Sequence, residues 1–106
     1  MIRVIFHGIR LYIDPDDILY ASRPEDGGDV KARLQGGAVS LPNKTSLVQL
    51  AQDYPQLLAI HRDTLVARSF IKAVVPLAKK ANGCTVLLKN DVQLHGSRRF
   101  LEEWTA

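Results

Sequence analysis

The sequence lacks the features that mark secreted, disulfide-bonded and membrane proteins. Its single cysteine, Cys84, cannot form an internal disulfide, and we expect a buried or half-buried thiol in a reducing cytoplasm. No apolar run approaches the roughly 18 residues of a membrane span. The opening residues Met1-Ile2-Arg3 do not begin a signal peptide. We therefore expect a cytoplasmic protein with no membrane insertion.

The sequence also lacks the spacings of a catalytic or metal site. The three histidines are scattered without the close spacing of a zinc site: His7, His61 and His95. His61 and Asp63 are too close in the chain for a base and its orienting carboxylate, and no nucleophile is placed beside them. Gly27-Gly28 and Gly36-Gly37 are typical of turns and not of a phosphate-binding loop. We expect no enzyme activity, no metal and no cofactor.

Cations are concentrated in the second half of the chain. Residues 1–53 contain six Lys or Arg against seven Asp or Glu, a balance of −1, whereas residues 54–106 contain eight against four, a balance of +4. The stretch from His61 to Arg99 has eight cations and two carboxylates, and so carries +6. A basic half favours a polyanionic partner, most commonly nucleic acid. The alternative is an ordinary solvated Lys/Arg surface.

The length and the hydrophobic pattern predict one domain, residues 1–106, that is mainly β. Short alternating or β-branched segments bounded by turn residues are predicted strands: 2–6, 9–13, 18–21, 30–34, 38–41, 57–61, 71–77, 85–88 and 92–94. The His7-Gly8 pair suits a hairpin turn, and Pro76 predicts an edge strand or a bulge. Long helices do not alternate with the strands, so we do not expect a doubly wound parallel sheet.

Helices are predicted at two places. Asn43 or Thr45 is the expected cap of a short mid-chain helix over Ser46 to Asp53. Ser97 is expected to cap a C-terminal helix that ends near Trp104. The segment 64–66 is expected to form one helical turn.

The segment from Ile60 to Ile71 combines core residues with exposed cations. Its apolar residues can face a core: Ile60, Leu65, Val66, Phe70 and Ile71. Its polar residues lie on the opposite side: His61, Arg62, Asp63, Arg68 and Ser69. Arginine suits recognition of phosphate or guanine, because its rigid guanidinium can form two parallel hydrogen bonds. A charged surface turn between two buried segments would give the same pattern.

Two arginines fall in the first turn of the C-terminal helix. Arg98 and Arg99 follow the Ser97 cap, although the helix dipole disfavours cations at that end. Backbone N–H groups at a helix start attract phosphate, so an anionic partner would explain both residues. An ion pair of Arg98 with Glu102 at i,i+4 is the alternative, and it accounts for only one of them.

Four segments together resemble the LytTR DNA-binding domain of bacterial response regulators. They are Asp17-Ile18-Leu19-Tyr20, Ser46-Leu47, I-H-R-D-T-L-V-A-R over Ile60 to Arg68, and G-S-R-R-F over Gly96 to Phe100. The resemblance covers nearly the whole chain. It implies an elongated fold of about ten strands in small antiparallel sheets, with loops that enter successive DNA major grooves. It also implies sequence-specific binding of double-stranded DNA at promoter direct repeats, as the output part of a two-component regulator.

The resemblance assigns roles to individual residues. Arg62 and Arg99 become the residues expected to contact bases, and Arg98 and Ser97 become backbone contacts. Three further cations are phosphate candidates, in falling order: Lys44, Arg68 and Arg23. His61 is expected to pack and to hydrogen-bond locally. A homodimer on tandem half-sites is expected from the family.

The chain departs from the family pattern at three places. Its Ser22–Asp29 loop has one cation, Arg23, among three carboxylates, although this loop contacts DNA in the family. Asp63 replaces a small polar residue and could either neutralise or orient Arg62. Gly96 replaces a larger apolar residue. No receiver domain precedes the motifs in this sequence, so direct switching by phosphorylation is not expected if the chain is complete. The alternative function is a stand-alone interaction module that pairs with a full-length regulator or a membrane partner without reading DNA.

Overall fold

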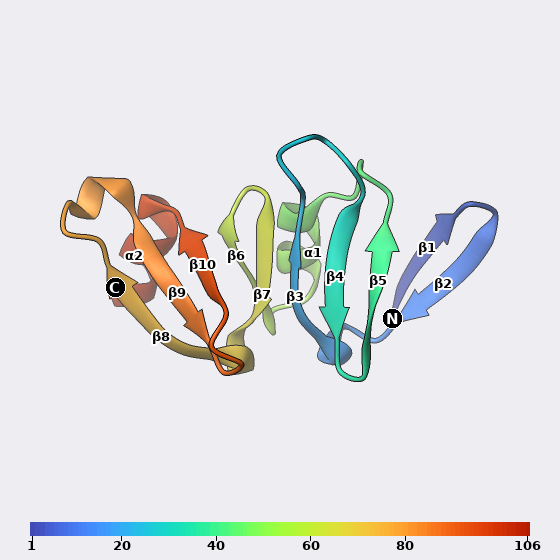
Figure 1. The fold of residues 1–106 in the computed structure, drawn as a ribbon. Coiled ribbons are helices and arrows are strands. Elements are labelled where there is room, and N and C mark those ends of the chain that lie inside the picture. Colours follow the sequence, from blue (N-terminus) through green and yellow to red (C-terminus); the bar gives the residue numbers. More distant parts are fainter.

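Ten strands and two α-helices make up most of the chain (Figure 1). The structure is a computed structural model that describes residues 1–106, with every side chain except that of Lys80. The strands are β1 (Ile2–Phe6), β2 (Ile9–Ile13), β3 (Ile18–Ser22), β4 (Val30–Leu34), β5 (Gly37–Leu41), β6 (Leu57–His61), β7 (Thr64–Ala67), β8 (Ile71–Pro76), β9 (Cys84–Leu88) and β10 (Gln93–Gly96). The helices are α1 (Leu47–Asp53) and α2 (Arg98–Thr105).

The strands form three antiparallel sheets that follow one another along an elongated molecule of 46 × 27 × 24 Å (Figure 1). The first sheet is the β1–β2 hairpin, the second has the order β5-β4-β3-β7-β6, and the third has the order β10-β9-β8. Helix α1 lies beside the second sheet, and α2 lies beside the third (Figure 1). The predicted mainly-β fold with small antiparallel sheets and two helices is confirmed.

The N-terminal hairpin forms where its turn residues predict it. His7 and Gly8 have φ values of 51° and 77°, as a two-residue hairpin turn with matching twist requires. The ladder on either side pairs Phe6 with Ile9 and continues to Ile2 opposite Ile13. Pro76 ends β8, which is an outer strand of the third sheet. An outer strand tolerates proline, whereas an inner strand needs the backbone N–H that proline lacks.

Two hydrophobic cores lie on opposite sides of β7. The first core lies under the second sheet and includes Ile18, Val30, Leu41, Leu47, Leu57 and Leu65. The second core joins the third sheet to α2 and includes Ile60, Val66, Cys84, Val86, Leu88 and Phe100. Consecutive side chains of a strand point to opposite faces, so Leu65 enters the first core and Val66 enters the second. Strand β7 therefore separates the two cores and belongs to both.

The prediction of a helical turn at 64–66 was wrong, because these residues belong to β7. Leu65, Val66 and Ala67 are all buried, so the strand shows none of the alternation that marks a half-exposed strand. A short apolar run of this kind does not distinguish a strand from a helical segment. A 3-10 turn over Arg68–Phe70 follows the strand.

The helix caps are partly as predicted. Ser97 caps α2, since its Oγ accepts the Phe100 N–H at 3.1 Å, and the helix extends to Thr105. The cap predicted for α1 was wrong: Ser46, and neither Asn43 nor Thr45, accepts the first free N–H, with its Oγ 3.2 Å from the Gln49 nitrogen. Among the described residues, no helix is both long and apolar enough to cross a membrane.

Candidate nucleic-acid interface

Segments from both halves of the molecule meet along one edge. The β3–β4 loop, the β6–β7 turn and the β10–α2 junction lie along the upper edge of Figure 1. A backbone hydrogen bond of 2.8 Å from the Ser97 N–H to the Ile60 carbonyl joins the start of α2 to the end of β6. This bond places Arg98 and Arg99 next to the turn that carries Arg62, although more than thirty residues separate them in the chain.

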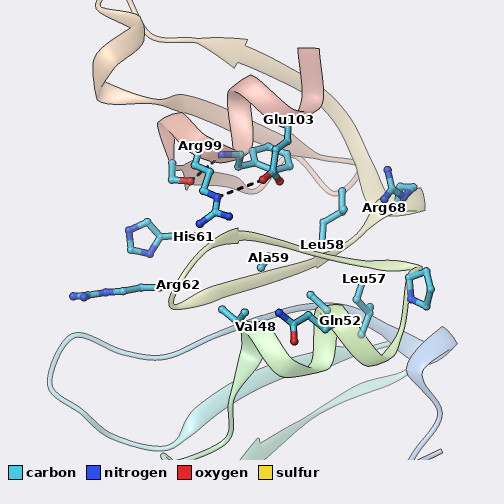
Figure 2. Close-up of a pocket in the computed structure, with 14 residues that line it drawn as sticks. Val48, Gln52, Leu57, Leu58, Ala59, His61, Arg62, Arg68, Arg99 and Glu103 are labelled. Atoms are coloured by element: carbon cyan, nitrogen blue, oxygen red, sulfur yellow. Dashed lines mark hydrogen bonds and ion pairs between the residues drawn. The ribbon is translucent and has the colours of Figure 1, made fainter. Parts of the chain in front are cut away.

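Arg62 lies in the two-residue turn between β6 and β7, where His61 pairs with Thr64. Its side chain is 85% exposed and extends away from the protein (Figure 2). The only ion pair that it makes with a described residue joins its Nε to Asp63 Oδ2 at 3.6 Å, which is long for a hydrogen bond. The guanidinium is therefore open to an external acceptor.

Arg23 behaves in the opposite way. Its guanidinium donates to Asp63 Oδ1 at 3.1 Å and to the Asn43 carbonyl at 3.0 Å, and it also contacts the Thr45 carbonyl. The Arg23 N–H donates to the Asp63 carbonyl at 2.8 Å. Arg23 thus ties the β3–β4 loop and the β5–α1 loop to the β6–β7 turn. This tie joins residues 40 positions apart, so no sequence spacing indicates it.

Asp63 contacts both arginines and orients the turn. One carboxylate oxygen accepts from Arg23, and the other lies near Arg62. The Asp63 N–H also donates to His61 Nδ1 at 3.3 Å. His61 makes this local bond and lies with its ring 6.0 Å from that of His95. No three His, Cys, Asp or Glu side chains in the described part of the chain gather as they would around a metal ion.

At the start of α2, both arginines have an i,i+4 carboxylate. Arg98 Nε lies 3.7 Å from Glu102 Oε1, and Arg99 Nε lies 3.4 Å from Glu103 Oε1. The inference that such pairing explains only one arginine was therefore wrong, and the same spacing rule could have found the second pair. Such pairs are weak when exposed, and the Arg99 side chain is 90% exposed. Both guanidiniums keep free N–H groups.

Close backbone packing holds the start of α2. Gly83, at φ +92°, lies against the Gly96 carbonyl and the Ser97 backbone, and leaves no room there for a Cβ. A Cβ on Gly96 would lie 2.7 Å from Cys84 Sγ and 3.1 Å from a ring carbon of Phe100. The family's larger apolar residue at Gly96 would not fit here, because the side chains of the second core occupy that volume.

Cys84 is fully buried in this second core, as the sequence predicts for a lone thiol. Burial raises the pKa of the Cys84 thiol above its ordinary value, because the thiolate would be desolvated, and a hydrogen bond with the Gly96 backbone opposes part of that shift. A buried, neutral thiol is a poor nucleophile.

The remaining predicted contacts lie at different distances from the turn. Lys44 is exposed in the β5–α1 loop, between the two residues whose carbonyls Arg23 holds. Arg68 lies at the opposite end of the β6–β7 hairpin, where its N–H donates to the Gln56 carbonyl at 2.9 Å. The four residues of β7 separate Arg68 from the turn by about 13 Å. Lys44 therefore shares the edge with Arg62, and Arg68 does not.

A groove of about 750 Å³ runs along β6 between α1 and α2 (Figure 2). Four of the predicted contact residues line it: Arg62, Arg68, Ser97 and Arg99. Its exposed apolar lining includes Val48 of α1, which is 43% exposed, and the half-buried Leu58 of β6. The groove thus extends from the edge that carries Arg62 and Arg99 to the far end of the hairpin.

A family model described as the LytTr DNA-binding domain matches residues 10–105. The chain belongs to the LytTR family. The LytTR match includes the β6–β7 turn and the start of α2, and it begins after β1. This family is described as a DNA-binding domain.

The LytTR fold is also found by comparison with solved structures. A LytTr DNA-binding domain from Bacillus cereus, described as part of a methyl-accepting/DNA response regulator, is similar with a TM-score of 0.70 at 11% sequence identity. The similarity covers 97% of this chain and 91% of the other. No curated protein matches the sequence.

Proposed function

We propose that this LytTR domain binds double-stranded DNA sequence-specifically in bacterial transcription regulation. The β6–β7 turn and the start of α2 would enter successive major grooves at direct repeats, with two copies on tandem half-sites. The observation that carries the proposal is the Ser97–Ile60 hydrogen bond, which brings two exposed arginines from distant parts of the chain to one edge. We expect this function in the cytoplasm.

Arg62 and Arg99 are the proposed base contacts. Their side chains are 85% and 90% exposed, and each lies near only one carboxylate, at 3.4 Å or more. A guanidinium can donate two hydrogen bonds to guanine O6 and N7, and each such pair discriminates against other bases by about 1–3 kcal/mol.

Arg98, Ser97 and Lys44 are the proposed phosphate contacts. Ser97 Oγ accepts the Phe100 N–H, so its own hydroxyl hydrogen remains available to a phosphate. Arg68 and Arg23 are weaker candidates for different reasons. Arg68 lies at the other end of the hairpin, and Arg23 has three acceptors within the protein.

The test is a fluorescence anisotropy titration with duplexes selected from a random pool. We expect enrichment of a spaced direct repeat, and we expect Arg62→Ala and Arg99→Ala each to weaken binding to it by about 10- to 100-fold. Binding to an unrelated duplex should change much less. Arg33→Ala, on the exposed face of β4, is the matched control. Equal losses on both duplexes would contradict base reading.

The dependence of the DNA-binding constant K on salt concentration reports the number of phosphates that the protein neutralises. If about five phosphates are neutralised, log K should fall against log salt with a slope of about −4.5. A flat response would contradict the electrostatic part of the proposal.

A second candidate function is an interaction module that pairs with a regulator. The inward orientation of Arg23 favours it, because Glu25 and Asp26 are then left exposed in a loop on the same edge as Arg62. Those carboxylates would repel phosphates. Stable complex formation with a purified response regulator, together with no enriched sequence in the selection, would favour this function over DNA reading.

A further inference from the structure

The free edge of β6 is the feature that the proposed DNA binding does not use. Strand β6 is an outer strand of the five-stranded sheet, and it faces the groove between α1 and α2. Outer strands carry backbone N–H and C=O groups that have no partner strand, and another chain can pair with them.

The register of the hairpin shows which backbone groups face the groove. The Arg68 N–H donates to the Gln56 carbonyl, and Leu58 pairs with Val66 two residues further along. The backbone groups of an antiparallel strand alternate in direction, so Ala59 turns its N–H and C=O away from β7. Ala59 lines the groove, and no hydrogen bond to its backbone from outside the hairpin occurs among the described residues.

Neighbouring bonds flank this open position. The Ile60 carbonyl accepts the Ser97 N–H, and the Leu57 N–H donates to the Tyr54 carbonyl at 2.9 Å. Both ends of β6 are therefore occupied on the groove side, and the middle is open. Residues of α1 and of α2 line the groove together with Ala59.

The charge and the apolar surface of the groove define what fits. Arg62 and Arg99 lie at one end, Arg68 lies at the other, and Glu103 is the one carboxylate of the groove lining. The lining between the ends is partly apolar. An extended peptide with alternating acidic and apolar side chains complements both features, because successive side chains of a strand point to opposite sides.

We propose that the groove binds an extended acidic peptide of another protein as an added strand on β6, paired through the backbone of Ala59. Apolar side chains of the peptide contact Leu58 and Val48, and its carboxylates pair with Arg68 and with the arginines at the other end. Because Arg62 and Arg99 are also the proposed base contacts, peptide and DNA compete. A bound peptide would release the domain from DNA.

The test is a titration of the 15N-labelled domain with a synthetic peptide of about seven residues that alternates glutamate and valine. We expect the largest amide shift changes along β6, centred on Ala59, and protection of the Ala59 amide from exchange. We expect Arg68→Glu to weaken peptide binding at least tenfold.

Two controls separate this mode from general charge attraction. Arg33→Glu makes the same charge change on β4 and should leave peptide binding unaltered, and a peptide with lysine in place of glutamate should not bind. Equal weakening by Arg68→Glu and Arg33→Glu, shifts centred away from β6, or no binding at millimolar peptide would overturn the proposal. None of these outcomes depends on whether the domain reads DNA.

Discussion

The β6–β7 turn and the start of α2 carry the two proposed base contacts, but the protein holds these two segments by different means. The turn is held by side-chain hydrogen bonds from Arg23, which reach Asp63 and the β5–α1 loop. The start of α2 is held by backbone contacts, in which Gly83 lies against Gly96 and the Ser97 N–H bonds to β6.

The two segments should therefore respond differently when a residue that holds them is substituted. A hydrogen-bonded ion pair at a half-exposed site contributes modestly, and the loop that it ties can separate without disturbing a core. A backbone contact without space for a methyl group cannot adjust, because the neighbouring atoms also belong to backbone. We therefore expect a larger loss of stability from damage at α2 than from damage at the turn.

The largest effect is expected for Gly83→Ala. The new Cβ would clash with the Gly96 carbonyl, and the φ of +92° is unfavourable for alanine, so the free energy of unfolding should fall by about 3 kcal/mol or more. Gly36→Ala is the matched control, since Gly36 has φ +84° but nothing within 4 Å of the new Cβ. Urea unfolding gives the loss of unfolding free energy for each variant, and the difference between the two losses isolates the contribution of the backbone contact at Gly83. Equal losses would show that backbone strain, and not packing, governs this position.

A smaller effect is expected for Arg23→Ala. Loss of its bonds to Asp63 and the β5–α1 loop should lower the free energy of unfolding by about 1–2 kcal/mol. Binding to the selected DNA should weaken because Asp63 is no longer held in place to orient the turn, whereas the slope of log K against log salt should stay unchanged.

Lys44→Ala is expected to leave stability unaltered and to make the slope of log K against log salt less steep by about 0.9. A reduced slope in Arg23→Ala would make Arg23 a phosphate contact after all.

The smallest effect concerns Cys84, behind the start of α2. Burial raises the pKa of its thiol, so the folded protein favours the protonated form more than the unfolded chain does. The stability from this preference is complete below the ordinary pKa of 9.0 and is lost as the pH rises above it. The stability difference between the unchanged protein and Cys84→Ala should therefore shrink between about pH 7 and about pH 10. A constant difference would contradict the raised pKa.

Local features predicted the fold better than they predicted the site. The hairpins followed from turn residues such as His7-Gly8, and Ser97 was identifiable as a cap, because these signals involve neighbours in the chain. Strand β7 was missed because burial on both faces removes the alternation that marks a strand. The inward orientation of Arg23 was missed because its partner Asp63 is 40 residues away. By contrast, the pairing of Arg99 with Glu103 could have been read from the sequence.

The adjacent side chains of Leu65 and Val66 have a consequence for how the molecule unfolds. An elongated protein with two cores could lose one and keep the other. Here β7 contributes Leu65 to the first core and Val66 to the second. Opening either core therefore displaces a strand that also closes the other core. We expect the two halves to unfold in a single transition, with the slowest amide hydrogen exchange along β7. The turn and the helix that carry the proposed base contacts would then keep a fixed spacing until the whole domain unfolds.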